Sequence, residues 1–234
     1  MIYFMGDTHG DFRELNKLLE TTTENDYIII CGDFGYWRKS KFKMGLGWFH
    51  DDIINTNGTK VIWCDGNHED HVELDYLVKE KGFESPIEIS KNILYAPRGS
   101  VFVTNDSTKI LFMGGAMSTD KAQRLAYFDW FPQEIISNSD LRRIGDEVEE
   151  GAYDVIVSHT CPKMCCSRMA FEIGLAYTDR PDSSCDALQY LFERFKPKKW
   201  FFGHWHVFTQ FEQEGCHFTA LNMSGKKGHY VKYE

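Results

Sequence analysis

Short hydrophobic runs recur along the chain, and each is closed by Gly or by a polar residue. The runs are rich in β-branched and aromatic residues, which is typical of strands buried on both faces. Strands are predicted at Ile2–Met5, Tyr27–Cys31, Val61–Cys64, Ile110–Met113, Val155–Val157 and Trp200–Phe202. From Val207 to Tyr233 the pattern instead predicts antiparallel strands joined by Gly215 and by Ser224-Gly225.

Segments with helical spacing separate these runs. In the first of them Phe12, Leu15 and Leu18 recur on one face of a helix. In the last, Pro197 follows the periodic residues and indicates where the helix ends. Helices are predicted at Asp11–Glu20, Gly45–Ile54, Asp140–Glu149 and Ser183–Phe195. Strands that alternate with helices indicate an α/β fold.

Length and composition indicate a folded globular protein. The chain has 234 residues, of which 42% are hydrophobic, and it contains no internal repeat and no Pro/Gly/Ser-rich linker. We therefore expect one domain spanning residues 1–234. The formal net charge of −9 argues against binding of extended nucleic acid, because such proteins usually carry a basic face. It leaves open a nucleotide or a phosphoprotein as substrate.

Cysteine usage and the N-terminus bear on the cellular location. Seven Cys at irregular spacing predict free thiols in a reducing compartment. The cluster Cys161, Cys165 and Cys166 lacks the spacing of a zinc site. The apolar N-terminal run is too short for a signal peptide, and no run approaches the ~18 residues of a membrane helix. We expect a cytoplasmic protein without a membrane partner; the sequence does not indicate its oligomeric state.

Polar residues follow at once after five of the six predicted strands. Because ligands bind at the carboxyl ends of the strands in open α/β sheets, we expect these side chains to converge. They are Asp7, His9, Asp33, Asn67, His159, His204 and His206. A glycine precedes a polar residue at Gly6, Gly32, Gly66 and Gly203. Glycine permits positive φ and close backbone approach, so we expect the chain to turn sharply there.

The chemistry of this set points to divalent metals. Imidazole and carboxylate together suit Mn, Fe, Zn, Co or Ni. Seven ligands are too many for one tetrahedral ion and suit two ions that share a bridging carboxylate. Two ions about 3.5–4 Å apart form a clamp for in-line displacement at phosphorus, and a hydroxide held between them is the natural nucleophile. Such a centre keeps a net positive charge and attracts phosphate.

The ordered motifs Asp-x-His, Gly-Asp, Gly-Asn-His-Glu, His and Gly-His-x-His run from Gly6 to His206. This set resembles the metallophosphoesterase (calcineurin-like phosphoesterase) superfamily. The resemblance implies a four-layer αββα sandwich, in which two mixed sheets are flanked by helices and the metal site lies at the carboxyl ends of the strands.

The resemblance also implies roles for individual residues. Asp33 would bridge the two metals, and His68 would act as general acid outside the ligand set. The first metal would be held by Asp7, His9, Asp33 and His206, and the second by Asp33, Asn67, His159 and His204.

The sequence departs from the protein Ser/Thr phosphatase branch of that superfamily. That branch carries Asp-Arg-Gly after the second motif and Arg before Gly-Asn-His. Here the second motif continues as Phe34-Gly35, and Asp65 precedes the third. We predict that Arg98 and Arg124 replace the missing arginines as substrate-binding residues. The alternative for each is a surface salt bridge.

Three functions are compatible with these residues. The first is a phosphomonoesterase, with two metal ions, Mn foremost, acting on a small phosphorylated molecule, a nucleotide or a phosphoprotein. The second is a phosphodiesterase or nuclease, which predicts a basic groove that the net charge of −9 does not support. The third is a binding scaffold without catalysis, which predicts eroded ligands, whereas every motif here is intact.

Overall fold

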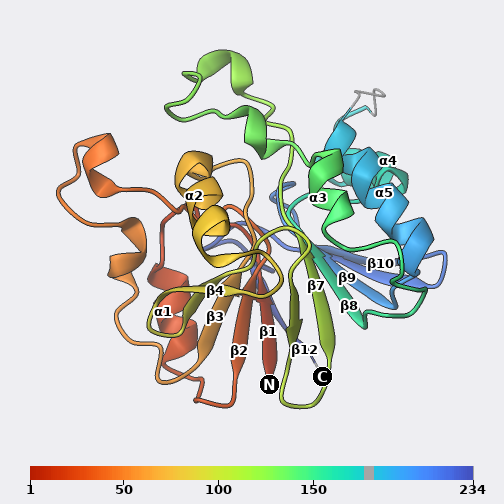
Figure 1. Ribbon diagram of the computed structural model, residues 1–234, viewed down its shortest axis with the longest axis horizontal. Helices are drawn as coiled ribbons and strands as arrows, with labels where there is room; N and C mark the ends of the chain where they lie inside the picture. Colours follow the sequence, from red (N-terminus) through yellow and green to blue (C-terminus); the bar gives the residue numbers. More distant parts are fainter. Residues whose placement is uncertain (177–181, 234) are drawn as a thin grey trace.

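The computed structural model describes residues 1–176 and 182–233, and its strands form two sheets (Figure 1). The strand order is β12-β1-β2-β3-β5-β4 in the first sheet and β10-β11-β9-β8-β7-β6 in the second. The first sheet contains β1 (Ile2–Met5), β2 (Tyr27–Ile30), β3 (Lys60–Trp63), β4 (Ile87–Ser90), β5 (Ile93–Tyr95) and β12 (Tyr230–Tyr233). The second contains β6 (Val101–Val103), β7 (Lys109–Met113), β8 (Val155–Ser158), β9 (Lys199–Phe202), β10 (Thr209–Gln213) and β11 (Cys216–Ala220).

Both sheets follow the same mixed plan. In the first, β1, β2, β3 and β5 run parallel, and β12 and β4 pair antiparallel at the two edges. In the second, β7, β8, β9 and β11 run parallel, with β6 and β10 antiparallel at the edges. Parallel central strands require cover on both faces, which explains why their sequences are continuously apolar.

Helices cover the outer face of each sheet (Figure 1). Helices α1 (Arg13–Leu19) and α2 (His71–Lys81) pack on the first sheet. Helices α3 (Asn138–Arg142), α4 (Cys166–Glu172) and α5 (Ser183–Phe195) pack on the second. A third core fills the space between the sheets. The predicted four-layer sandwich of two mixed sheets flanked by helices is confirmed.

The predicted strands are confirmed to within one residue at each end, whereas two of the helix predictions are wrong. The segment 45–54 contains only the 3₁₀ helix η2 (Phe49–Asp52), because Gly45 and Gly47 adopt φ values of 108° and 86° that no α-helix tolerates. The segment 140–149 contains only the end of α3, and Gly145 at φ 73° follows it. The other 3₁₀ helices are η1 (Lys39–Phe42), η3 (Lys121–Gln123), η4 (Pro132–Glu134) and η5 (Lys163–Cys165).

Helix α2 was not predicted because its apolar residues do not form one stripe. Val72 and Tyr76 are 51% and 61% exposed, and Leu74 is buried. The C-terminal strands also differ in part from the prediction. β10 and β11 form the expected antiparallel pair across Gly215, but β12 leaves that sheet and pairs with β1.

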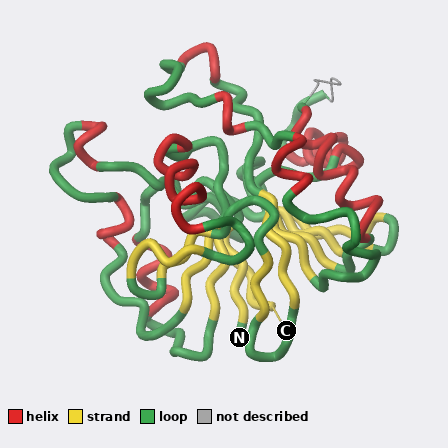
Figure 2. Tube along the Cα trace, viewed as in Figure 1, coloured by secondary structure: helices red, strands yellow, loops and turns green. Residues whose placement is uncertain are grey.

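The fold collects the long loops at one end of the sandwich. The two termini lie at the opposite end, next to each other, as Figure 2 shows. The loops that follow the parallel strands are therefore brought to a common edge, where ligands bind in α/β sheets. Among the described residues, none of the helices has the length and apolar character needed to cross a membrane.

The packing between the sheets gives a stability prediction. Phe4 of β1 stacks on Phe201 of β9 with ring centroids 3.7 Å apart, and Phe4 is fully buried. We expect Phe4→Ala to lower the free energy of unfolding by about 3–5 kcal/mol, because it leaves a cavity between two sheets that cannot collapse onto it. Phe171→Ala in α4 is the matched control, since Phe171 is 76% exposed. Urea unfolding of both variants measures the difference; equal losses would contradict this role of Phe4.

Candidate metal centre

Five strands deliver polar residues to one end of the sandwich. Three belong to the first sheet and two to the second, so the cluster spans the ends of both. Asp7 and His9 follow β1, Asp33 follows β2, Asn67 and His68 follow β3, His159 follows β8, and His204 and His206 follow β9. All seven residues that the sequence singled out as metal ligands lie in this region.

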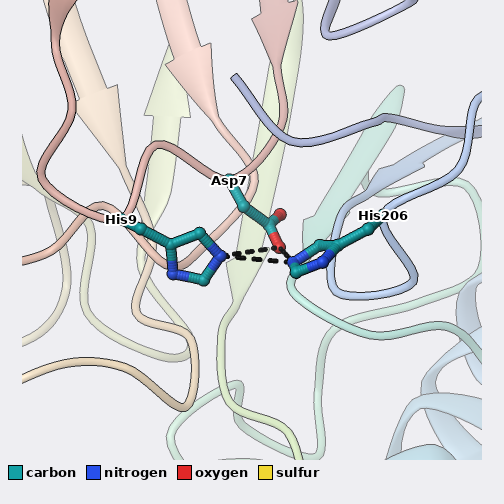
Figure 3. A group of neighbouring side chains, drawn as sticks. All are labelled: Asp7, His9 and His206. Atoms are coloured by element: carbon teal, nitrogen blue, oxygen red, sulfur yellow. Dashed lines mark hydrogen bonds and ion pairs between the residues drawn. The ribbon is translucent and has the colours of Figure 1, made fainter. Parts of the chain in front are cut away.

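Asp7, His9 and His206 form one group (Figure 3). Oδ2 of Asp7 lies 2.9 Å from Nε2 of His206 and 3.9 Å from Nε2 of His9. The two imidazole Nε2 atoms are 3.2 Å apart. The Asp7 side chain is fully buried while that of His206 is 43% exposed, so the group is reachable from solvent on the His206 side.

Asp33 lies between this group and a second, more deeply buried one. Its Oδ2 is 3.7 Å from Nδ1 of His9 and 3.3 Å from Nε2 of His159. The same Nε2 of His159 lies 3.0 Å from Oδ1 of Asn67. The ring of His204 is 4.9 Å from that of His159, centroid to centroid. Asp33 thus contacts residues of both groups, which is the geometry a bridging ligand needs.

The described residues contain three overlapping groups whose ligand atoms lie within 4.8 Å of one another. They are Asp7, His9 and His206; His9, Asp33 and His68; and Asp7, Asp33 and His159. His68 therefore lies close enough to act on the same centre. Its backbone N–H donates to Oδ1 of Asp33 at 2.8 Å, and its carbonyl accepts from Nε1 of Trp37 at 2.8 Å.

The charges of this cluster fit divalent cations. Asp7 and Asp33 are buried, and no Lys or Arg in the described ranges 1–176 and 182–233 pairs with either carboxylate. Burial lowers the pKa of His159, but the Asp33 carboxylate outweighs it and raises this pKa to about 10. The positive charge that Asp33 favours beside it is one that a divalent cation would supply in place of the His159 proton. Burial lowers the pKa of His204 to about 3, which leaves it neutral and able to coordinate. Two anionic oxygens, an amide and four imidazoles suit a pair of borderline metals.

Backbone contacts orient two of these ligands. Nδ1 of His159 lies 2.9 Å from the carbonyl oxygen of Cys31, so Nδ1 carries the proton and Nε2 faces the cluster. The Asp7 carboxylate accepts from the backbone N–H of His204 at 3.1 and 3.2 Å. Both contacts tie a ligand of one sheet to the backbone of the other.

The four glycines that precede candidate ligands mainly leave space for neighbouring groups, and they contribute little to the turning of the chain. Of the four, only Gly32 has positive φ, at 89°. A Cβ atom on Gly66 would overlap Oδ1 of Asp33, and one on Gly203 would overlap Oδ1 of Asp7. A Cβ atom on Gly6 would overlap the carbonyl oxygen of Asn222, and one on Gly32 would overlap Nδ1 of His159. The expected close approach is therefore confirmed at all four positions.

The left-handed conformation that we expected of the glycines is adopted mostly by ligands. His9, Asp33, His204 and His206 have φ values of 49°, 45°, 64° and 49°. Asp and His occupy this region more readily than most residues, and such strained backbone concentrates at functional sites. The sharp turns are thus built at the ligands themselves.

Arg98 and Arg124, both predicted to bind substrate, lie in different surroundings. The guanidinium of Arg98 is buried and donates to Asp65 at 2.6 and 2.9 Å, to Asp140 at 3.2 Å and to three backbone carbonyls. Its donors are all used inside the protein, so the substrate role of Arg98 stays a prediction that this geometry does not support. Arg124 reaches the cluster, with Nη2 2.8 Å from Nδ1 of His68.

Three residues near the centre were missed as functional candidates. Glu69 closes the third motif but drew no assigned role, and Ser118 and Glu134 lie outside every motif. The fully buried Glu69 carboxylate accepts from the backbone N–H groups of Phe34 at 2.7 Å, Gly35 at 3.1 Å and Tyr36 at 2.5 Å. It therefore fixes the loop that begins at Asp33. Ser118 contacts Asn67, and Glu134 contacts Ser118.

Comparisons with known proteins agree with this picture. The family model described as calcineurin-like phosphoesterase matches residues 1–208. Among curated proteins no match is found. The crystal structure of TT1561 of Thermus thermophilus superposes with a TM-score of 0.56 at 12% identity, covering 95% of this chain and 88% of that one. The phosphopantetheinyl hydrolase PptH from Mycobacterium tuberculosis gives 0.53 at 14%, covering 98% and 94%. Similarities this distant show the fold alone.

The Glu69 contacts generate a prediction. Glu69→Gln should lower the free energy of unfolding by about 2–3 kcal/mol, because the Gln amide offers one oxygen to three buried N–H donors and turns an NH₂ group toward the others. The control is Glu193→Gln, whose carboxylate is exposed and accepts only from Gln189 among the contacts described. Chemical denaturation of the two variants beside the native chain measures the effect. If both variants matched the native stability, the hydrogen bonds from the backbone of residues 34–36 to Glu69 would not stabilise the fold.

Proposed function

The chain belongs to the calcineurin-like phosphoesterase family, and on that premise we propose that it is a phosphomonoesterase with two metal ions. Family membership makes it a metal-dependent phosphoester hydrolase. The preference for monoesters, the choice of Mn and a cytoplasmic location are parts of the proposal. One observation carries it: Asp33 contacts ligand groups on both sides, so the cluster suits a pair of ions.

We assign the ligands in two sets that share Asp33. The exposed set contains the group around His206, and its solvent access suits the side from which substrate enters. The buried set contains the contact between His159 and Asn67. The first position would be formed by Asp7, His9, Asp33 and His206, and the second by Asp33, Asn67, His159 and His204.

When bound, two divalent ions polarise phosphoryl oxygens and lower the pKa of water to about 7. The protein's own part is to supply a proton to the leaving oxygen, and His68 is our candidate. Its ring lies 5.0 Å from that of His9, at the edge of the cluster. Burial lowers the pKa of His68, and the Arg124 charge adds to this, whereas Asp33 raises it. An incoming phosphate brings negative charge beside His68 and favours its protonated form.

Arg124 remains our candidate for contact with the phosphoryl group. Its side chain is 6% exposed, and Nη1 donates to the carbonyl of Asn67 at 3.0 Å. Nε pairs with Asp120 at 2.9 Å. Asp120 is 43% exposed whereas Glu134, the other carboxylate that pairs with Arg124, is fully buried. The pair with Asp120 is therefore the contact of Arg124 that an anionic ligand can reach from solvent.

The metal requirement and the ester preference can be tested together. After chelator treatment the protein should hydrolyse neither a phosphate monoester nor a diester, and Mn²⁺ should restore turnover of the monoester. The physical reason is that two buried carboxylates and four imidazoles cannot activate water without a cation. Phosphate released from the monoester and alcohol released from the diester measure the two activities, each with and without Mn²⁺. Turnover that survives metal removal would exclude the proposal, and preference for the diester would favour the nuclease alternative.

Two substitutions separate metal binding from proton transfer. Asp33→Asn should weaken binding at both metal positions together and abolish most turnover, because the shared ligand loses its charge. His68→Ala should keep the metal content and lower turnover by about 10²–10⁴-fold, the usual contribution of a general acid. Metal analysis and steady-state rates on the same preparations distinguish the two. Full metal content in Asp33→Asn, or metal loss in His68→Ala, would reverse the assignments.

A further inference from the structure

The two ends of the buried Asn67 amide have different partners. Oδ1 faces Nε2 of His159 at 3.0 Å, and Nδ2 donates to Oγ of Ser118 at 3.1 Å. Only the oxygen of an amide can coordinate a cation, whereas the NH₂ group can only donate hydrogen bonds. Asn67 therefore serves as a ligand in one of its two amide orientations, and something must select that orientation.

Ser118 makes this selection through the direction of its own proton. Its Oγ donates a hydrogen bond to Oε2 of Glu134, and both side chains are buried. Burial raises the pKa of Glu134 to about 7, while the hydrogen bond from Ser118 and the charge of Arg124 lower it. In its ionised form, paired with Arg124, the carboxylate only accepts, so the single hydroxyl proton of Ser118 points at Glu134. The lone pairs of Oγ are then left for Nδ2 of Asn67. A flipped Asn67 would place its oxygen against those lone pairs, which is repulsive.

The second oxygen of Glu134 connects, through Arg124, to His68, the residue that follows Asn67. Oε1 accepts from the backbone N–H of Phe131 at 3.3 Å and pairs with Nη1 of Arg124 at 3.4 Å. The guanidinium of Arg124 in turn contacts the carbonyl of Asn67 and the ring of His68. One buried carboxylate therefore connects to Asn67 through a hydroxyl and to His68 through a guanidinium.

We propose that Ser118 and Glu134 are positioning residues that hold the amide oxygen of Asn67 toward the second metal position. Glu134 is also proposed to hold Arg124 against His68. This inference rests on the proposed function, and it adds two residues from the loop after β7 to a centre otherwise built at the ends of other strands. Removing the hydroxyl should weaken one metal position and leave the other intact, because the first set of ligands does not contact Ser118.

The test is a Mn²⁺ titration followed by electron paramagnetic resonance of the free ion, with metal content per folded chain. In Ser118→Ala the first Mn²⁺ should bind as in the native chain and the second about 10- to 100-fold more weakly, the usual loss when a partner of a metal ligand is removed. The signal of a coupled Mn pair should disappear at concentrations that saturate the native chain. Ser118→Thr, which keeps the hydroxyl, should restore the second site.

A matched control separates this role from general packing. Ser100 is also buried, and its hydroxyl has no hydrogen-bond partner among the described residues. Ser100→Ala should therefore leave both metal affinities unchanged. Ser118→Cys keeps the shape of the side chain with a slightly larger atom and is a weak acceptor, and it should reproduce the loss if the alanine variant does not fold.

The outcomes are distinct. Native-like binding of both ions by Ser118→Ala and Ser118→Cys overturns the positioning role, and so does an equal loss in Ser100→Ala. A native chain that binds no pair of metal ions overturns the proposed function and this inference with it. A native chain that binds two ions while only the Ser118 variants lose the second supports both.

Discussion

The structure depends on holding two carboxylates, Asp7 and Asp33, out of water at one end of the sandwich. Moving an unpaired carboxylate from water into a protein interior costs several kcal/mol. Here imidazoles surround both groups, and no described Lys or Arg neutralises either. The two packed sheets must bring the carboxyl ends of their central strands together to surround them, because the candidate ligands follow β1, β2 and β3 in one sheet and β8 and β9 in the other. The stacked aromatic core between the sheets keeps these ends in register.

This constraint explains which parts of the fold the sequence predicts. β2 is apolar throughout, and β8 is apolar up to Ser158, because both faces of these strands are covered. Such a continuous run can be recognised in the sequence without knowing what packs on it. Helix α5 is visible because its apolar residues share one face and because Pro197 follows it. The helix predicted at 45–54 is wrong because Gly45 and Gly47 have positive φ, which the spacing of the apolar residues does not reveal. Helix α2 was missed because only part of one face is buried, a property set by what packs on it.

The candidate ligands were visible for a similar reason, whereas their supporting residues were not. A polar residue directly after a buried parallel strand lies at the carboxyl end of that strand, where ligands bind, and this position does not depend on the path of the loops. Ser118 and Glu134 lie in a long loop, and only the path of that loop brings them to Asn67. Arg98 and Arg124 look alike in sequence, yet Asp65 and Asp140 draw the first into the interior. The second contacts His68. Tertiary contacts decide between them.

The centre therefore combines two levels of organisation. The carboxyl ends of the strands supply the candidate metal ligands, and the paired strands are rigid enough to fix their backbone. An amide ligand, however, has a rotational ambiguity that backbone position alone does not remove. The loop between β7 and α3 supplies what the strands lack, namely an acceptor for the nitrogen of Asn67 and a cation beside His68. Because the same buried Glu134 serves both contacts, a change in this loop would alter metal affinity and the environment of the proposed acid together.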